Sequence, residues 1–477
     1  MIKEYAIIGG GIGGCSIAAL LNAKGHDVAL IEKEPYLGGC AATFKRKGNL
    51  YNAGATTLSG YHEGGMIKKL FDTIGVAPKL LSSDPSIAII QGDKICVRYR
   101  DPERFIEEVQ RFYPHTKHEP FWRLVHTLVN AFYAQKCDPY YSNRSIFKKL
   151  QSLCSFYPVL KTFYPYLFRN AREFIQRFYG EVSSEYLDFI DAQILIVAQA
   201  KSDQVNFFTA ALALGYTFQE THYPIGGMGG VCDSLVSNVA DVRKGCEVTG
   251  IQKKENYYIL SSKDEIIHAK NIIMGTSHFE SSMWFEDNNI KKYYSQYEQK
   301  NNFQSAFVLY MTIRSDETFY HHYQLISDSH LPSCTSNALF VSLSDPSDTQ
   351  MAPQGYYRIT ASIHTDSRYW LSLSRTEYRE QKKNLHYLLQ GWICDRLSLS
   401  SERVVESFAA TPKTFGRYIN RTQLGGNAMT MSNLFPLLPS NDTPIEGFYQ
   451  VGDTSYAAQG WPGVVMGAFN CMRLIDG

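Results

Sequence analysis

The chain has 477 residues, of which 44% are hydrophobic and 19% are charged. This composition is typical of a globular protein with two or three domains and excludes a disordered chain. A formal net charge of +1 gives no global field for nucleic acid, so we expect no nucleic-acid partner.

The N-terminal segment carries the pattern of a strand, a helix and a second strand. Residues 5–9 predict an apolar strand, 13–24 a helix and 27–32 the next strand, which together open a βαβ unit. The apolar stretch 5–21 could be taken for a signal peptide, but its glycines and its direct continuation into a strand argue against that. No run of 18 apolar residues suggests a membrane span. We therefore expect a cytoplasmic protein, peripheral on the membrane.

Helical patterns follow. Segments 86–90 and 95–99 flank a Gly-Asp turn and predict a hairpin. Asp101 then precedes a proline, which is typical of an N-cap and a first helical residue. From there to about residue 218 the pattern is mostly helical, and we expect interruptions at Pro114, Pro158 and Pro165.

Strand patterns return in the second half of the chain. They lie at 247–251, 257–261, 272–275, 305–313, 338–343 and 357–364. A helix at 375–397, a strand at 449–452 and a helix at 463–475 complete the order. This order predicts an α/β fold in which a discontinuous Rossmann-type domain holds an inserted α+β substrate domain with a mostly antiparallel sheet and a helical lid. The expected segments are 1–78, 223–280 and 425–477 for the Rossmann-type domain, 79–222 for a helical, membrane-facing region, and 281–424 for the substrate-domain sheet and helix.

The first strand runs into the motif Gly9-Gly-Gly11-Ile-Gly-Gly14. Gly9 permits the tight turn, Gly11 lets the backbone approach a pyrophosphate, and Gly14 lets the helix pack closely on the strand. Glu32, followed by Lys33, ends the second strand, where a carboxylate can accept hydrogen bonds from both ribose hydroxyls of an adenosine. A glycine-rich turn without a ligand is the alternative, and the combination of strand, helix and Glu32 makes it less favoured.

Further segments are expected to pass close to the same cofactor. Glycines follow the ribose-binding strand and recur some 15 residues later, where they permit close backbone approach to a ligand. The expected contacts here are Gly38, Gly39, Thr43, Gly54, Ala55 and Thr56, together with Val248 and Gly275 in two later strands.

The last motif follows the final strand. That strand delivers Gly452 and Asp453, and a helix begins close behind. A helix N-terminus directed at a flavin pyrimidine ring would stabilise the anionic reduced ring, which is chemistry that a flavin needs and a nicotinamide does not. The motif therefore favours FAD, although a helix that only completes the sheet remains the alternative. The expected contacts in this helix start are Gly460, Pro462, Gly463 and Val464.

A glycine run at 226–230 is not expected to be a second dinucleotide site. No strand pattern precedes it, and no acidic residue lies about 20 positions further on at a strand end. We expect a tight helix N-terminus beside FAD, and no separate NAD(P) domain.

In these positions the motifs resemble those of the phytoene desaturase-like superfamily of flavoproteins, and most closely the carotenoid cis–trans isomerase and retinol saturase branch. The likeness is carried by residues 38–44, 411–421 and 451–460, and less specifically by 223–230. Carotenoid desaturases and amine oxidases usually have Arg after the glycine pair, where this chain has Cys40. The resemblance is strong at both chain ends and weak from about residue 80 to 220.

The resemblance implies an FAD-dependent oxidoreductase acting on carbon–carbon bonds of a long apolar polyene or isoprenoid, by desaturation, saturation or cis–trans isomerisation. The flavin performs the difficult step, so no catalytic residue is evident. Arg417 and Arg421 are weak candidates near the ring, and structural ion pairing is open for both. The electron acceptor or donor is not indicated. A flavin amine oxidase and a non-catalytic, flavin-containing lipid-binding protein stay open as alternatives.

Residues 139–180 form a basic and aromatic stretch with Glu173 as its single acidic residue. A basic helix with aromatic anchors can lie in a membrane interface, whereas ordinary helices would turn the aromatics inward. Because the implied substrate dissolves in bilayers, we expect peripheral contact with an anionic membrane here. The cations are Arg144, Lys148, Lys149, Lys161, Arg169, Arg172 and Arg177.

The histidines and cysteines show no metal-ligand spacing, so no metal site is expected. His321 and His322 are adjacent, which would put their rings on opposite faces of a strand. We expect both at the surface.

Overall fold

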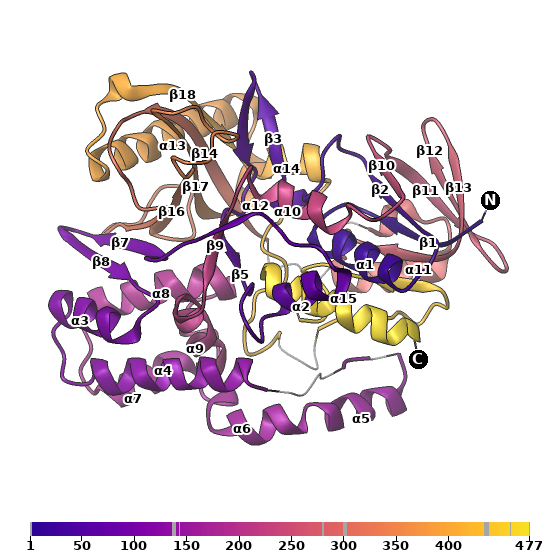
Figure 1. The fold of residues 1–477 in the computed structure, drawn as a ribbon, viewed down its shortest axis with the longest axis horizontal. Helices are drawn as coiled ribbons and strands as arrows, with labels where there is room; N and C mark the ends of the chain where they lie inside the picture. The colour runs from indigo at the N-terminus through magenta and orange to yellow at the C-terminus, as the bar shows by residue number, and fades with distance from the viewer. Residues whose placement is uncertain are drawn as a thin grey trace.

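The structure is a computed structural model that describes residues 2–135, 140–142, 144–278, 281–298, 303–433, 438–457 and 459–476. Two large sheets stand side by side, and a band of helices lies along one edge of the molecule (Figure 1). None of the helices in the described part of the chain combines the length and the apolar character that a membrane crossing requires.

The first sheet draws its strands from both ends of the chain, as the discontinuous Rossmann-type domain predicts. Its order is β10 (Asp241–Lys244), β2 (Val28–Glu32), β1 (Ile2–Ile8), β13 (Ile266–Met274), β12 (Tyr258–Ser262) and β11 (Val248–Lys253), and β19 (Phe448–Gln450) pairs with the second half of β13. The central strands are parallel and buried on both faces, which their continuous apolar sequences require.

Two helices from opposite ends of the chain pack together against this sheet. They are α1 (Ile12–Ala23) and α15 (Gly460–Asp476), with α2 (Met66–Ile74) and α10 (Met228–Leu235) beside α1 (Figure 1). Their apolar residues form one core with β1 and β2. The prediction of a domain assembled from both chain ends is therefore confirmed.

The second sheet is mostly antiparallel, as predicted. Its order is β18 (Val404–Ala410), β14 (Gln304–Arg314), β17 (Tyr356–Asp366), β16 (Ala338–Leu343), β15 (His322–Ile326), β7 (Ile87–Gln91) and β8 (Lys94–Arg98). The pair β15 and β7 is parallel. The long helix α13 (Arg375–Arg396) packs on one face of this sheet through Leu385, Leu389 and Ile393. The other face contacts the Rossmann-type domain.

The helical region begins where the sequence predicts it. Asp101 Oδ1 accepts a hydrogen bond from the backbone N–H of Arg104 at 2.9 Å and caps the first helix. One core that is rich in aromatic side chains joins several of these helices. They are α3 (Pro102–Phe112), α4 (His118–Tyr133), α5 (Ile146–Ser155), α6 (Tyr157–Leu167), α7 (Ala171–Tyr179), α8 (Ser184–Ala198) and α9 (Phe207–Gly215).

Pro165 does not interrupt its helix, which corrects one expected break. It lies inside α6, two residues before the helix ends at Leu167. A proline removes one backbone N–H and crowds the carbonyl four residues earlier, and here that disturbance is confined to the last turn. Pro158 lies in the first turn of α6, where proline is favoured.

The remaining elements are short. They are the hairpin β3 (Thr43–Arg46) and β4 (Asn49–Asn52), the small sheet of β5 (Leu58–Ser59), β9 (Thr221–Pro224) and β6 (Leu80–Ser82), and the helices α11 (Asn288–Glu298), α12 (Ser367–Ser372) and α14 (Pro412–Ile419). Single 3₁₀ turns occur at Gly39–Ala41, Tyr216–Phe218, Ser282–Trp284 and Ser401–Arg403.

A row of side chains across the second sheet forms hydrogen bonds with residues 52–57 of the Rossmann-type domain. Tyr310, Thr360, Ser342 and His322 are register neighbours on β14, β17, β16 and β15. The Tyr310 hydroxyl donates to the Ala53 carbonyl at 2.5 Å, and Thr360 Oγ1 donates to the Asn52 carbonyl at 3.2 Å. Ser342 Oγ lies 2.6 Å from Thr56 Oγ1, and His322 Nε2 lies 2.7 Å from Thr57 Oγ1.

The two adjacent histidines are not at the surface, which corrects the sequence-based expectation. His321 precedes β15 and is not part of it, so the two rings lie beside each other with centroids 4.1 Å apart. His322 is buried between Thr57 and Ser342. Burial lowers the pKa of His321 to about 4 and holds that of His322 well below its usual range. Both imidazoles are therefore neutral at pH 7, and the described residues contain no cluster that could hold a metal ion.

Candidate dinucleotide site and apolar cavity

A cavity of about 930 Å³ joins the carboxyl ends of the parallel strands to the inner face of the second sheet. Its walls come from the β1–α1 turn, the segment after β2, the start of α15, the helices α6, α8 and α9, and strands β14, β16 and β17. Ligands in open α/β sheets bind at the carboxyl ends of the strands, so one half of this cavity has the position of a dinucleotide site.

The glycines of the β1–α1 turn have distinct roles. Gly9 has a left-handed φ of 103°, which glycine adopts without strain. A Cβ on Gly14 would lie 1.9 Å from the Gly9 carbonyl oxygen, whereas a Cβ on Gly11 would meet no atom within 4 Å. Gly14 is thus required for packing, and Gly11 leaves open space in the cavity wall at the N-terminus of α1. A phosphate group fits this cradle, because bare backbone N–H groups and the helix dipole both favour an anion there.

The Glu32 carboxylate holds the two loops of the site together. Oε2 accepts a hydrogen bond from the Gly10 N–H at 2.7 Å, and Oε1 accepts one from the Glu34 N–H at 2.9 Å. Burial raises the pKa of Glu32, and the two backbone hydrogen bonds oppose that shift. Because carboxylate oxygens can accept further hydrogen bonds, Glu32 can still receive ribose hydroxyls from the cavity that it lines.

We expect the Glu32→Ala variant to retain much less dinucleotide cofactor after dilution than the parent protein. Each charge-assisted hydrogen bond lost weakens binding by about 1.5–3 kcal/mol, and the amides of Gly10 and Glu34 also lose their acceptors. The ratio of flavin to protein absorbance after gel filtration measures the loss. The Glu255→Ala variant removes the same charge from an exposed position and should retain the cofactor. Full retention by the Glu32 variant would show that the carboxylate does not contact the cofactor.

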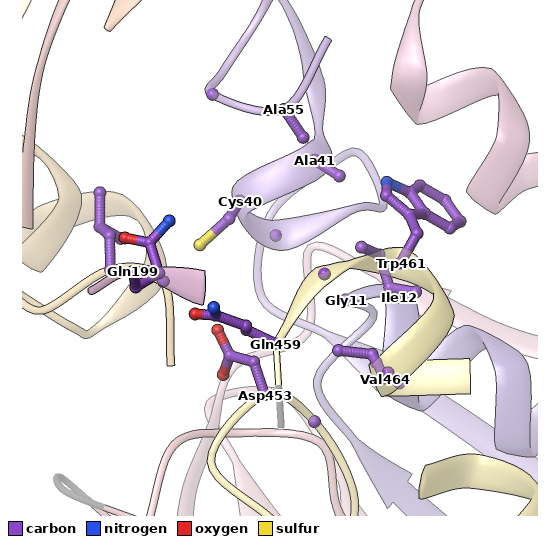
Figure 2. Close-up of a pocket in the computed structure, with 18 of the residues that line it drawn as sticks. Gly11, Ile12, Cys40, Ala41, Ala55, Gln199, Asp453, Gln459, Trp461 and Val464 are labelled. Atoms are coloured by element: carbon purple, nitrogen blue, oxygen red, sulfur yellow. The ribbon is translucent and has the colours of Figure 1, made fainter. Parts of the chain in front are cut away.

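The C-terminal motif closes the same half of the cavity. Gly452 has a φ of 117°, and Arg421 Nη1 lies 3.0 Å from Asp453 Oδ1. Helix α15 begins at Gly460, and its first turn borders the cavity beside the Gly11 turn (Figure 2). The N-terminus of α15 is therefore available to a group that lies between the phosphate cradle and the rest of the cavity.

Most of the sequence-predicted cofactor residues line this cavity. They are Gly9, Gly11, Glu32, Lys33, Gly38, Gly39, Gly54, Ala55, Thr56, Val248, Gly275, Gly452, Asp453, Gly460, Pro462, Gly463 and Val464. Of the two arginines, Arg421 lines the cavity and is ion-paired, whereas Arg417 lies in α14 outside the lining. Gly14 supports the wall from behind.

Thr43 lies outside the cavity lining, and its hydroxyl binds a backbone group of another element. It accepts a hydrogen bond from the Gly229 N–H at 2.9 Å, while Asn52 Oδ1 accepts from the Met228 N–H at 2.9 Å. These two side chains cap the N-terminus of α10. The glycine run at 226–230 is thus a tight helix N-terminus as expected, but β9 precedes it and its glycines do not line the cavity. Its N–H groups are satisfied within the protein.

The other half of the cavity is mostly apolar. The helices contribute aliphatic and aromatic side chains, and the second sheet contributes small residues and one phenylalanine. The lining includes Phe132, Val159, Leu160, Leu167, Leu195, Ile196, Phe208, Leu212, Ala306, Val308, Ala338, Phe340, Met429 and Met431. Phe168, which is 67% exposed, also borders the cavity. The apolar half therefore reaches the molecular surface beside α6.

Three polar residues that the sequence did not suggest lie in this lining. Gln199 follows α8, His364 is on β17, and Gln459 precedes α15. Gln199 and Gln459 both approach Cys40 and Asp453 (Figure 2). Isolated polar residues in variable segments carry no spacing signal, so only the fold could bring these together.

The cofactor-binding end also matches a known family model. Residues 7–74 match the NAD(P)-binding Rossmann-like domain. The whole chain is 25% identical to prolycopene isomerase of Daucus carota, over 99% of this chain and 80% of that protein. It is 22% identical to carotenoid 3,4-desaturase of Haloarcula japonica, over 96% of this chain and 95% of that protein. The sequence relationship therefore includes the helical region, where the motifs are weak.

Solved structures share the fold at low sequence identity. An oxidoreductase from Methanosarcina mazei superposes with a TM-score of 0.64 at 18% identity, over 98% of this chain and 100% of that one. Putrescine oxidase bound to putrescine superposes with a TM-score of 0.63 at 13% identity, over 100% of both chains. These likenesses show that this chain shares the fold of those two proteins.

Proposed function

We propose that this chain, a member of the phytoene desaturase-like superfamily of flavoproteins, is an FAD-dependent oxidoreductase acting on carbon–carbon bonds of a long apolar polyene. The observation that carries the proposal is the continuity of the cavity. One end has a phosphate cradle and a carboxylate, the other is apolar, and the N-terminus of α15 lies between them. A bound flavin ring at that junction would face the apolar half.

Different segments of the chain would bind the cofactor and align the substrate. Glu32 and the Gly11 turn would bind the adenosine and pyrophosphate, and the first turn of α15 would stabilise negative charge on the ring. When bound, FAD supplies hydride transfer or single-electron chemistry. The apolar helices exclude water and align the polyene, which offers no polar group to hold.

The substrate class follows from the relatives and from the cavity chemistry together. Prolycopene isomerase and carotenoid 3,4-desaturase are named for carotenoid reactions, and a carotenoid-like chain suits the apolar half. Purified protein with FAD should be incubated anaerobically with cis and all-trans polyenes in liposomes, and the products separated by chromatography. We expect desaturation, saturation or isomerisation of a polyene. Flavin reduction by amines alone would favour an amine oxidase, and polyene binding without turnover a lipid-binding protein.

We further propose that α5 and α6 contact the membrane from which the substrate enters. Both helices lie at the outer edge of the molecule (Figure 1). On α5, Ile146 and Phe147 are 77% and 73% exposed. Tyr157 and Tyr164 on α6, and Phe168 directly after it, are each at least 64% exposed and lie at the spacing of one helical face. The opposite side of α6 lines the cavity, so this helix would separate the bilayer from the site.

The cations of this stretch differ in what they can do at a surface. Arg172 is committed to the fold, because its guanidinium is hydrogen-bonded to Asp191 and to Ser202 Oγ at 2.7 Å. Lys149, Lys161 and Arg169 are exposed. Only exposed cations can attract anionic head groups, so the test replaces these three residues and not Arg172.

Replacing Lys149, Lys161 and Arg169 by Gln should weaken binding to anionic liposomes at low salt. Each cation near an anionic surface contributes about 1 kcal/mol, so three correspond to roughly 100-fold in partitioning. Liposome flotation at low and high salt measures this, since salt screens the attraction. The flavin content should not change, because none of the three residues lines the cavity.

The apolar contribution requires its own variant and control. Replacing Ile146, Phe147 and Leu150 by Ser should lower liposome binding even at high salt, because burial of apolar side chains is not screened. Tyr387 and Leu388 on α13 are also exposed, and Ser at these two positions should leave flotation unchanged. Parent protein that remains unbound at low salt would exclude the membrane contact.

A further inference from the structure

An imidazole in the apolar half of the cavity is held in a defined orientation. His364 lies on β17 opposite Ala306 of β14, and both line the cavity. His364 Nε2 lies 2.9 Å from Gln199 Oε1, while Gln199 Nε2 donates to the Ile196 carbonyl at 3.3 Å. An amide oxygen can only accept, so Nε2 of His364 carries the proton. The other ring nitrogen, Nδ1, then has a free lone pair.

The fold makes specific room for this pair. Gln199 ends α8 with a φ of 54°, a left-handed conformation that is uncommon for a residue other than glycine. A Cβ on Gly425 would lie 2.6 Å from Gln199 Oε1, so the absence of a side chain there lets the amide reach His364. A strained backbone conformation persists only where the surrounding structure enforces it. The conformation of Gln199 places its side-chain amide against His364.

The surroundings of His364 keep its imidazole in the neutral form. Its nitrogen Nδ1 has no hydrogen-bond partner among the described residues. Within the described ranges, His364 is the only histidine of the cavity lining and is hydrogen-bonded to none of its carboxylates. Asp453, the carboxylate that Gln199 approaches, is ion-paired with Arg421. Burial lowers the pKa of His364 to about 4, and the charge of Lys201 acts in the same direction. The imidazole is therefore neutral at pH 7 and can accept a proton.

We propose that His364 is the catalytic proton acceptor for carbon–carbon chemistry in this cavity, and that Gln199 is the positioning residue that fixes its tautomer. This inference rests on the proposed function. In a desaturation, the polyene would lose a hydride to a flavin-class acceptor and a proton to Nδ1 of His364. The electron pair of the second C–H bond would become the new C=C bond. Nδ1 of the neutral imidazole has a lone pair and no proton, so in this state it can take up a proton from the substrate but cannot supply one.

The tautomer can be tested without any substrate. Protein labelled with ¹⁵N-histidine should give a ¹H–¹⁵N spectrum in which His364, assigned by its loss in the His364→Gln variant, is neutral with the proton on Nε2. The Gln199→Leu variant should lose this preference, because the acceptor of the Nε2–H is gone. A proton on Nδ1, or a charged ring at pH 7, would overturn the proposal whatever the substrate proves to be.

The catalytic role is tested by anaerobic reduction of the bound flavin with a polyene. The His364→Gln variant should react about 100-fold more slowly or worse, the usual contribution of a general base, with flavin content and polyene absorption spectrum unchanged. The matched control is His386→Gln, since His386 on α13 contacts Ser407 and does not line the cavity. It should react like the parent protein.

The outcomes separate the two proposals. A parent protein that converts no polyene contradicts the proposed function, while the tautomer experiment still decides the geometry of His364. A parent protein that converts a polyene together with a His364→Gln variant of equal rate contradicts the role of His364 alone. If His364→Gln loses its flavin, His364→Asn takes its place in the rate comparison.

Discussion

Replacing Gly14 by alanine should abolish retention of the dinucleotide cofactor. The added Cβ would lie 1.9 Å from the Gly9 carbonyl oxygen and 3.1 Å from the Gly9 carbonyl carbon. Neither atom belongs to a flexible side chain, so α1 must move away from β1 and the turn at Gly9 must deform. Overpacking typically destabilises a protein by about 1–3 kcal/mol. Here the clash would also distort the turn that would bind the pyrophosphate. We expect the dissociation constant for FAD to rise at least 100-fold, about 3 kcal/mol.

Titration of apoprotein with FAD, followed by quenching of flavin fluorescence, measures the change. Gly391 provides the matched control, because it lies inside α13 and a Cβ there would meet no atom within 4 Å. Gly391→Ala should bind FAD normally and be slightly more stable, since alanine is favoured over glycine in a helix by about 1 kcal/mol. Unchanged FAD affinity in Gly14→Ala would mean that the β1–α1 turn is not part of the cofactor site.

Replacing Arg98 by alanine should destabilise the protein by about 3–5 kcal/mol, because a large-to-small change in a core costs about 2–5 kcal/mol and each buried acceptor left without a donor about 1–3 kcal/mol. Arg98 is 1% exposed and has no ion-pair partner among the described residues. Its guanidinium instead donates to Gln193 Oε1, to the Leu214 carbonyl at 2.5 Å and to Thr217 Oγ1 at 2.5 Å. Alanine would leave these acceptors without donors and would open a cavity in the aromatic core.

The aromatic rings around Arg98 define the control. The guanidinium carbon lies 4.0 Å from the ring centroid of Phe105 and 5.1 Å from that of Trp122. Arg98→Met fills most of the space without the charge, so it should cost about 2 kcal/mol less than Arg98→Ala. Urea unfolding followed by tryptophan fluorescence measures both. Equal stability of Arg98→Ala and the parent protein would show that α8 and α9 do not depend on this residue.

The sequence was most informative where local pattern and chemistry coincide. The turn from Gly9 to Gly14 requires glycine for steric reasons that any Rossmann-type fold shares, and Glu32 ends a strand whose apolar run is unmistakable. The capping residue Asp101 acts within three residues of the chain, so its role is visible without tertiary structure.

Features that depend on distant partners could not be predicted. Strand β15 is not among the predicted strands, and its polar side chains bind buried partners and not water. His322 contacts Thr57 and Ser342, and Gln324 donates to the Ala192 carbonyl. The hydroxyl of Thr43 lies near the cofactor in sequence, yet it caps α10, nearly 190 residues away. In each case the partner comes from a distant part of the chain and is brought close only by the fold, which a single sequence does not reveal.

The pairing of the first strand has a consequence for synthesis of the chain. Strand β1 is neighboured by β13 from residue 266 onward, and the sheet is completed by β19 at 448–450. A ribosome delivers these partners long after β1 has emerged, so an apolar edge stays open during most of translation. Unpaired strand edges favour aggregation. The nascent chain should therefore carry an aggregation-prone strand edge until β13 has been synthesised.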